Sequence, residues 1–341
     1  MEDNAYICKG KKRRSYDQWL ADKTGLPERF TPKMLYNWQL AALSRRAAYA
    51  AAHSSFYRSL YADYDVNDPL RLPFIREDDI RNWGYAMACM PGSEIQRVVS
   101  MYTSGSTGKP KRLYFSEADL ELTIDFFAQG MLNMTGPGQR VLICMKGSTP
   151  DGLGDLLSRG LRRIGAEPFV YGEIRDYGEA ARVLTELCPH CIVGIPRQIL
   201  ALAELTPNMR PCSVLLSGDN IPPELRRRVE WLWQTEVFGH WGMRETGLGG
   251  AVECHAHCGQ HIRHADLFIE IIDPESGRVL PAGETGEVVI STLTREAQPL
   301  LRYRTGDYSR LLYDICPCGS LLPRLDQVAG HKDKIMEEDK R

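Results

Sequence analysis

The segment YTSGSTGKPK, residues 102–111, combines two glycines with short hydroxyl side chains and two lysines. Glycine lets the backbone approach a ligand closely, hydroxyl groups are short hydrogen-bond donors, and lysine adds positive charge; phosphate requires this combination. The segment is not a Walker A loop, because only two residues separate Gly105 from Gly108 and Pro110 follows Lys109. It therefore predicts a phosphate-binding loop of another type, with a flexible polar turn as the alternative.

Three further stretches contain groups that a nucleotide site needs. Residues 237–247, VFGHWGMRETG, run from a predicted strand into a turn that contains Glu245. Residues 302–309, RYRTGDYS, place Asp307 after a glycine, and residues 215–220, LLSGDN, form a strand end and a turn. A bound nucleotide requires phosphate donors, a carboxylate for Mg²⁺, a carboxylate for the ribose hydroxyls and a flat surface for the base.

The elements around these stretches alternate in type. Residues 34–62 are rich in Ala and Leu and predict one long helix. Between about 95 and 250, short apolar runs such as RVVSMYTS predict buried strands, and amphipathic stretches between them predict helices. This alternation favours a largely parallel sheet covered by helices, with ligands at the ends of its strands. After residue 250 the pattern predicts antiparallel hairpins.

Composition excludes several classes of function. The chain of 341 residues is 43% hydrophobic and has a formal charge of −2, so it can bury a large core but has no basic surplus for nucleic acid or an anionic membrane. No apolar run is long enough to span a bilayer, and no secretory signal is recognisable at the N-terminus, so a cytoplasmic protein is expected. Its ten cysteines are then expected to be thiols or metal ligands.

Taken together and in this order, these stretches resemble the adenylate-forming enzymes, which include acyl-CoA synthetases, peptide-synthetase adenylation domains and luciferases. The resemblance runs from about residue 16 to the end and is closer to the phenylacetate–CoA ligase branch, through LPFIREDDIR, YTSGSTGKPK, WGMRETG, FIEIIDPESG, GEVVISTLTREAQPLLRYRTGD and CPCG. It implies an α/β fold with two βαβ-type lobes and mixed sheets, plus a small antiparallel, barrel-like β subdomain. The expected divisions are 1–250 for the lobes, 251–326 for the β subdomain and 327–341 for a hinge remnant.

The same resemblance implies roles for single residues. The loop around the β- and γ-phosphates would be formed by Thr103, Ser104, Gly105, Ser106, Thr107, Gly108 and Lys109. Trp241, where the family usually has Tyr, would cover one face of the adenine. The other nucleotide-site candidates are Ser217, Gly218, Asp219, His240 and Gly242, of which His240 lines the acyl pocket or is simply packed.

The residues expected to be catalytic are Glu245, Thr246 and Lys109, and Asp307 is expected to bind the nucleotide. Glu245 would hold Mg²⁺, Thr246 would approach the α-phosphate, and Asp307 would bind the ribose hydroxyls. The implied reaction is attack of a carboxylate on the α-phosphorus of MgATP, which gives an acyl-adenylate and pyrophosphate, followed by displacement of AMP by CoA or another thiol.

The acid is expected to be aryl or phenylacetate-like, because the family places apolar residues around the acyl group. The neighbours of the acyl pocket that the resemblance suggests are Phe126, Phe127, Met131, Met145 and Gly147.

Two cysteine-rich turns form a second candidate site. Cys254, Cys258 and His261 lie in ECHAHCGQH, and Cys316 and Cys318 lie in CPCG. Four of these five residues can form one tetrahedral site of soft ligands, with reduced surface cysteines as the alternative. Relatives with this pattern bind zinc at the positions of Cys254, His261, Cys316 and Cys318, and the role of such zinc would be structural.

The pattern departs from the family near the C-terminus. Residues 328–335, VAGHKDKI, resemble the hinge before the mobile C-terminal lid, with His331 where Arg is usual. The lid and its lysine are expected to be absent, to be supplied by a separate chain, or to have been lost with activity. An alternative is therefore a non-catalytic protein that binds a nucleotide or acyl-adenylate, and a homodimer is a further expectation.

Overall fold

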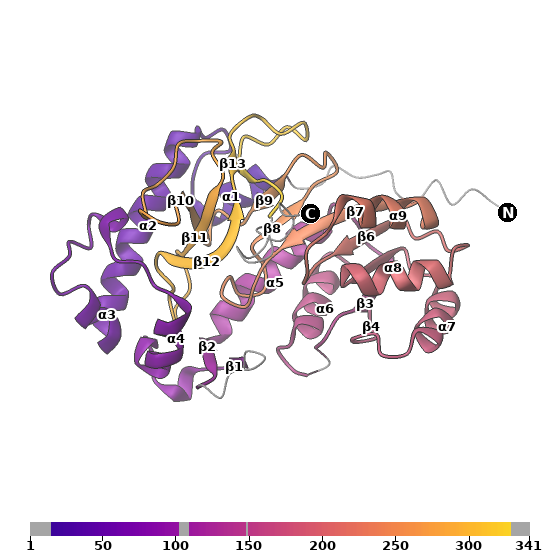
Figure 1. Cartoon of the computed structure of the whole chain (residues 1–341), viewed down its shortest axis with the longest axis horizontal. Helices are drawn as coiled ribbons and strands as arrows, with labels where there is room; N and C mark the ends of the chain where they lie inside the picture. Colours follow the sequence, from indigo (N-terminus) through magenta and orange to yellow (C-terminus); the bar gives the residue numbers. More distant parts are fainter. Residues whose placement is uncertain (1–14, 102–108, 148, 329–341) are drawn as a thin grey trace.

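The structure is a computed structural model that describes residues 15–101, 109–147 and 149–328. Figure 1 shows the helices and strands in chain order. The α-helices are α1 (Tyr16–Thr24), α2 (Pro32–His53), α3 (Ser55–Leu60), α4 (Glu77–Trp83), α5 (Glu117–Met131), α6 (Leu153–Arg163), α7 (Tyr177–Leu187), α8 (Pro196–Leu205) and α9 (Pro223–Trp233). The strands are β1 (Arg97–Met101), β2 (Lys111–Phe115), β3 (Arg140–Cys144), β4 (Glu167–Val170), β5 (Cys191–Gly194), β6 (Ser213–Leu216), β7 (Glu236–Trp241), β8 (Ala251–Glu253), β9 (Gln260–Ile262), β10 (Leu267–Ile272), β11 (Gly286–Thr292), β12 (Tyr303–Ser309), β13 (Leu311–Leu312) and β14 (Arg324–Leu325).

A nine-stranded mixed sheet is the largest element, with the strand order β13-β14-β9-β8-β7-β6-β5-β3-β4. From β4 to β7 neighbouring strands are parallel, and from β7 to β13 they are antiparallel. Strand β7 therefore belongs to both halves of the sheet. In parallel sheets of this kind ligands bind beyond the carboxyl ends of the strands, and the end of β7 is Trp241.

Both faces of the parallel half are buried, as the apolar runs in the sequence predict. Along β3, Val141 and Ile143 belong to one hydrophobic core, while Leu142 and Cys144 belong to another. The first core includes residues of α5 and α6, and the second includes residues of α7, α8 and α9. Figure 1 shows α7, α8 and α9 on the outer side of the half of the sheet that contains β6 and β7.

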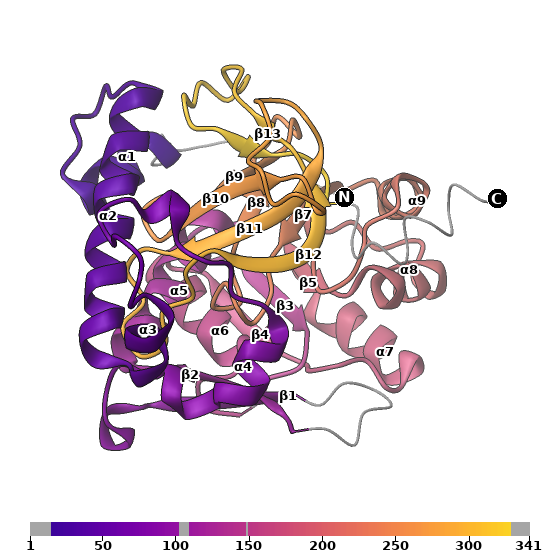
Figure 2. The ribbon, with the colours of Figure 1, turned by 60° about the vertical axis from the view of Figure 1, so that its left-hand side comes forward.

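A separate three-stranded antiparallel sheet, β10-β11-β12, lies against α2 (Figure 2). The contact is polar as well as apolar: Gln39 Nε2 of α2 donates to the carbonyl oxygens of His264 at 2.9 Å and Leu267 at 3.2 Å. Arg46 of α2 donates to the carbonyl oxygen of Leu293 at 3.1 Å. Helix α2 therefore holds the start of β10 and the segment after β11 in place.

The predicted α/β fold class is confirmed by this combination of a large mixed sheet and a small antiparallel sheet. Strands β7 and β8 pair across the predicted division at residue 250. The division into domains there stays a prediction. The strands after 250 are shared between two sheets, because β8, β9, β13 and β14 extend the large sheet. Most of the expected hinge segment, residues 329–341, lies outside the described residues.

Two local predictions were wrong. The run RVVSMYTS does not enter the parallel sheet: β1 pairs only with β2, antiparallel, and its residues alternate between half-buried and exposed. The single helix expected over 34–62 is two helices, since α2 ends at His53 and the Ser54 hydroxyl accepts from Tyr57 N–H to begin α3. Apolar content alone does not distinguish an exposed hairpin from a buried strand, or locate such a cap.

Among the described helices, none combines the length and apolarity required to cross a bilayer.

A polar cluster connects α9 with the junction of β7 and β8. Arg226 of α9 forms two hydrogen bonds with the Glu253 carboxylate, at 2.8 and 2.9 Å, and Glu253 also accepts from Gly239 N–H at 3.0 Å. His257 lies between Glu253 Oε2, 3.0 Å from its Nδ1, and Glu236 Oε1, 2.9 Å from its Nε2. Hydrogen bonds to Glu236 and Glu253 raise the pKa of His257 from 6.5 to about 9.

We expect His257 to stabilise the fold in its protonated form. Because its folded pKa lies above the unfolded value, the contribution is fully present below pH 6.5 and is lost as the pH rises through about 9. Urea titrations give the free energy of unfolding of the unaltered protein and of His257→Gln. The difference between the two values should therefore fall by roughly 1–3 kcal/mol between pH 6 and pH 10. The exposed His53→Gln variant is the control, and a pH-independent difference for His257→Gln would contradict the assignment.

Candidate active site

A cavity of about 280 Å³ lies beyond the carboxyl ends of β6 and β7. Asp307 reaches it from β12 of the small sheet, so the cavity lies between the two sheets. Its lining includes Asp307 and five further residues that were predicted for the nucleotide site. These five are Gly218, Asp219, His240, Trp241 and Gly242. Parallel strand ends and one strand of a separate sheet thus bring these positions together from three separate stretches of the sequence.

The Trp241 side chain links the two sheets through a hydrogen bond. Its indole Nε1 donates to Asp307 Oδ2 at 2.9 Å, and the ring is 8% exposed. The ring packs against the backbone of Gly250, where a Cβ atom would meet ring atom Cε3 at 2.6 Å. Gly250 is therefore needed for the ring to lie where it does, and the ring in turn orients the Asp307 carboxylate.

Glu245 lies in the turn after β7 and is 4% exposed. Its Oε1 forms an ion pair with Lys111, the first residue of β2, and accepts from Tyr303 Oη at 3.5 Å. Lys111 Nζ also lies 3.1 Å from Glu77 Oε1, at the start of α4. Burial next to Glu245 raises the pKa of Tyr303 well above its usual range, so its hydroxyl stays protonated and able to donate.

The turn after β7 is held by further buried contacts. Arg295 Nη1 donates to the Glu245 carbonyl at 3.0 Å, and its guanidinium lies 4.1 Å from the centroid of the Phe115 ring. The Thr246 hydroxyl accepts from Met243 N–H at 3.1 Å and donates to the Met243 carbonyl at 2.8 Å. Thr246 therefore stabilises the turn in this structure, and its approach to a phosphate stays a prediction.

The predicted phosphate loop, residues 103–108, lies outside the described residues. The residues that flank it are described: Met101 pairs with Lys111 across the β1–β2 hairpin, and the predicted Lys109 is exposed. Because Lys111 contacts Glu245, the two ends of this segment lie near the carboxylate that was predicted to hold Mg²⁺.

A second, apolar cavity of about 30 Å³ adjoins the first. Phe126, Phe127, Met131 and Met145, the predicted acyl-pocket neighbours, all line it. Gly147 does not; a Cβ atom there would meet Gly154 N at 2.5 Å, so its role is to let the backbone pack against the start of α6. Since the cavity is small, an acyl group can fill it only if side chains such as the methionines move.

His240 lines both cavities. Its Nδ1 lies 2.8 Å from Ser217 Oγ, and its ring centroid lies 6.3 Å from that of Phe126. Burial lowers the pKa of His240 from 6.5 to about 4, so the imidazole is neutral at pH 7. Ser217 lines only the apolar cavity of the two, whereas its predicted partners Gly218 and Asp219 line the polar one.

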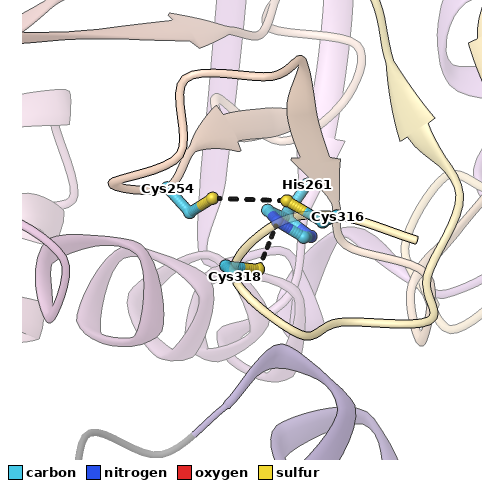
Figure 3. Close-up of side chains that lie close together, drawn as sticks. All are labelled: Cys254, His261, Cys316 and Cys318. Atoms are coloured by element: carbon cyan, nitrogen blue, oxygen red, sulfur yellow. Dashed lines mark hydrogen bonds between the residues drawn. The ribbon is translucent and has the colours of Figure 1, made fainter. Parts of the chain in front are cut away.

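Three cysteines and a histidine lie close together in the antiparallel half of the large sheet (Figure 3). Cys254 follows β8, His261 lies in β9, and Cys316 and Cys318 lie in the turn before β14. Their ligand atoms all lie within 4.8 Å of one another. The sulfur atoms of Cys254 and Cys316 are 3.7 Å apart, and Cys318 Sγ lies 3.4 Å from His261 Nε2. Cys258, the fifth sequence candidate, is exposed, and its thiol donates to the Ala256 carbonyl at 3.1 Å, so it lies outside this cluster.

These distances match a tetrahedral metal site. With metal–sulfur bonds of about 2.3 Å and metal–nitrogen bonds of about 2.0 Å, tetrahedral ligands are separated by about 3.8 Å for two sulfurs and about 3.5 Å for sulfur and nitrogen. Tyr16 of α1 stacks on His261 with ring centroids 4.3 Å apart and covers the cluster.

Some residues of the site were not predicted from the sequence. Lys111 lies in the first stretch quoted above, but its pairing with Glu245 could not be inferred, because the partners are 134 positions apart, 245 − 111. Glu77 likewise belongs to the LPFIREDDIR motif without any signal of its partner. Gln260 and Gln327, which line the polar cavity, have no distinguishing sequence context.

Comparison with known proteins identifies the family. The model of the AMP-binding enzymes matches residues 77–294, a span that contains Lys111, Trp241 and Glu245. The chain belongs to the AMP-binding enzyme family.

Similar AMP-binding enzymes include two curated phenylacetate–coenzyme A ligases. The protein from Thermus thermophilus is 28% identical over 316 residues, which cover 86% of this chain and 69% of that protein. The protein from Pseudomonas putida is 28% identical over 322 residues, covering 87% and 71%.

Among solved structures, an open conformation of 2-hydroxyisobutyryl-CoA ligase in complex with 2-HIB-AMP and CoA has a TM-score of 0.79 at 23% identity. The match covers 89% of this chain and 76% of the chain in that structure. The same ligase in the thioesterification state has a TM-score of 0.80, also at 23% identity, and covers 91% of this chain and 70% of its own. These similarities confirm the fold of this AMP-binding enzyme.

We expect Trp241→Phe to weaken AMP binding roughly tenfold, because phenylalanine keeps a flat ring but removes the N–H that orients Asp307. Isothermal titration calorimetry with AMP measures the dissociation constant. Trp231→Phe on α9, whose indole is 63% exposed, is the matched control. An unchanged dissociation constant in folded Trp241→Phe would show that the indole donor does not orient a nucleotide-binding group.

Proposed function

We propose that this AMP-binding enzyme activates a carboxylic acid with MgATP and transfers the acyl group to CoA or another thiol. The observation that supports this most is the pair of adjoining cavities: one is polar and contains a carboxylate and an indole ring, the other is apolar, and His240 lines both. An acyl-adenylate has two corresponding parts, a nucleotide and an acyl group, joined by the anhydride oxygen between the α-phosphorus and the carbonyl carbon. The similarity to the two phenylacetate–coenzyme A ligases favours an aryl acid such as phenylacetate.

The proposed reaction has two displacements. In the first, a carboxylate oxygen bonds to the α-phosphorus of ATP, the bond to the β-phosphate oxygen breaks, and pyrophosphate leaves. In the second, a thiol sulfur attacks the carbonyl carbon, loses its proton, and expels AMP. Both steps bring anions together, so positioning and charge neutralisation are the main contributions a protein can make.

Roles follow from the contacts in the polar cavity. Asp307, oriented by Trp241, would accept hydrogen bonds from the ribose hydroxyls, and the indole face would lie against the adenine. Gly218 and Asp219 would border the other side of the base. The phosphates would lie toward Glu245 and the segment that contains Thr103, Ser104 and Lys109, with Thr246 nearby.

Glu245 would hold Mg²⁺, which when bound neutralises phosphate charge. Both described contacts of its carboxylate involve Oε1, so Oε2 is the oxygen that fits a metal. Lys111 would hold the carboxylate in place before the substrate binds.

We also propose that Cys254, His261, Cys316 and Cys318 bind a structural zinc ion. Three thiols and an imidazole are soft ligands that select zinc, and four protein ligands leave no open position for catalysis. The ion would connect the β8–β9 hairpin to the turn before β14, and β8 pairs with the strand that carries Trp241.

Hydroxylamine trapping tests the proposed activation. The purified 341-residue chain, given MgATP and a panel of aryl and short aliphatic acids, is expected to form a hydroxamate with at least one acid. Asp307→Ala should lower hydroxamate formation at least about a hundredfold, because a half-buried carboxylate that would hold the ribose is lost, whereas exposed Asp63→Ala should not change it. AMP binding without hydroxamate from any acid would contradict activation and favour a nucleotide-binding role.

Metal analysis tests the zinc proposal. The purified protein should contain about one zinc per chain, and Cys318→Ser should lose it and melt at least about 5 °C lower. Cys258→Ser, which changes a cysteine four residues from Cys254 but outside the cluster, should keep both metal and melting temperature. Equal metal content in all three proteins would exclude this cluster as the site.

A further inference from the structure

Helix α4 contributes a carboxylate that shares a lysine with the candidate active site. Glu77, the first residue of α4, has its Oε1 atom 3.1 Å from Lys111 Nζ, and the same ammonium group forms the ion pair with Glu245 Oε1. Glu77 Oε1 also accepts a hydrogen bond from Arg81 Nη2 at 2.6 Å. Lys111 therefore bridges a carboxylate of α4 and the carboxylate of the turn after β7.

Backbone hydrogen bonds fix the position of Glu77. Two residues before it, Ile75 N–H donates to the Arg302 carbonyl at 3.1 Å, and the Ile75 carbonyl accepts from Arg304 N–H at 2.9 Å. These two bonds attach the segment before α4 to the start of β12, the strand that reaches the polar cavity. The carboxylate of Glu77 is therefore held in a defined position relative to the site.

Helix α4 also contacts the backbone that follows the predicted phosphate loop. Arg81 lies one turn after Glu77, and its Nη1 donates to the Lys109 carbonyl at 3.5 Å. The backbone of Lys109 and the side chain of Lys111 are thus held by two residues of α4 that also pair with each other.

The two carboxylates that pair with Lys111 differ in burial. The side chain of Glu245 is 6% exposed and that of Glu77 is 42% exposed, with Lys111 at 10% between them. A lysine ammonium group is a compact charge on a flexible stem, so it can shift from one of these partners toward the other. Glu77 is the partner nearer to solvent.

A second partner matters because Lys111 and a metal ion would compete for Glu245. Two cations at one carboxylate repel each other, and a buried ammonium group that lost its only partner would be left with an uncompensated charge. With Glu77 in place, the ammonium group keeps a counter-charge when it shifts away from Glu245. Without Glu77, its remaining carboxylate partner among the described residues is Glu245.

We propose that Glu77 is a positioning residue that acts through Lys111 to make Glu245 available to the metal ion of the bound nucleotide. The inference rests on the proposed role of Glu245 in holding Mg²⁺ and adds the residue that controls access to it. Loss of the Glu77 carboxylate would leave Lys111 paired with Glu245 alone, so Mg²⁺ would bind there more weakly.

Calorimetry with ATP over a series of Mg²⁺ concentrations, with no acid present, tests this role. The readout is the Mg²⁺ concentration that gives half of the full tightening of ATP binding. Glu77→Gln is expected to raise this concentration about threefold to tenfold. Glu77→Asp keeps the charge but withdraws it from Lys111 by one methylene group, and should raise the concentration nearly as much. Asp78→Asn removes the same charge from the exposed neighbouring residue and should leave the concentration unchanged.

A double variant tests the route through Lys111. In a Lys111→Gln background, Glu77→Gln should change the half-tightening Mg²⁺ concentration less than about twofold, because the residue through which Glu77 acts is absent. An equal effect in both backgrounds would overturn the inference and indicate a general effect of charge. If thermal melting shows that Lys111→Gln is unfolded, Glu77→Asp decides the outcome.

The controls separate this inference from the proposed function. The dissociation constant of AMP without Mg²⁺ reports the rest of the nucleotide site and should be the same in every folded variant of Glu77. An unchanged half-tightening concentration in folded Glu77→Gln and Glu77→Asp would overturn the role of Glu77 alone. ATP binding that does not depend on Mg²⁺ in the unaltered protein would overturn the proposed Mg²⁺ site and this inference with it. Activation of the acid is tested separately by hydroxamate formation, so the two proposals can fail independently.

Discussion

The hydrogen bond from Trp241 Nε1 to Asp307 Oδ2 is the contact on which the candidate site depends. Trp241 is the last residue of β7, where the large sheet changes from parallel to antiparallel pairing, and Asp307 lies in β12 of the other sheet. The bond thus joins the two sheets at the wall of the polar cavity. Because the indole donor is uncharged, it sets the orientation of the carboxylate before a ligand arrives without adding a charge of its own.

Around this contact the site combines buried charge with paired partners. The Lys111 ammonium group neutralises Glu245 and also contacts Glu77, and Arg295 holds the backbone of the same turn. Isolated charges at such depth would be costly, whereas removing one partner would leave the other unpaired. These ion pairs are better understood as fixing the turn after β7 than as a large source of stability, because desolvation offsets much of their attraction.

The wall of the apolar cavity, in contrast, contains few polar side chains. Only Ser217 and His240 contribute polar side chains to its wall, and one nitrogen of the imidazole is left without a partner among the described residues. A wall of this kind disfavours ligands with polar groups deep in the cavity, because such groups would lose their water without gaining a partner. The apolar residues would then determine the size and shape of the acyl group that enters.

The sequence by itself determined the family, the α/β class and the motifs that contribute to the site. Local patterns carried this information: apolar runs of strand length, amphipathic stretches of helix length, and glycine-rich turns that contain Glu245 and Asp307. Five predicted nucleotide-site residues line one cavity because strand ends of parallel sheets meet at one edge, a rule that needs no coordinates, whereas Asp307 reaches that cavity from a strand of the other sheet.

Only the tertiary structure decided which residues meet across long separations. The pairing of Lys111 with Glu245, the separation of Cys258 from the other three cysteines, and the exposed β1–β2 hairpin all depend on how distant segments pack. Sequence periodicity reports burial along one element, but a contact between side chains depends on the relative placement of two elements. For the same reason His240 could not be distinguished in the sequence from a packed histidine, whereas its position between the two cavities follows from the ends of β6 and β7 lying side by side.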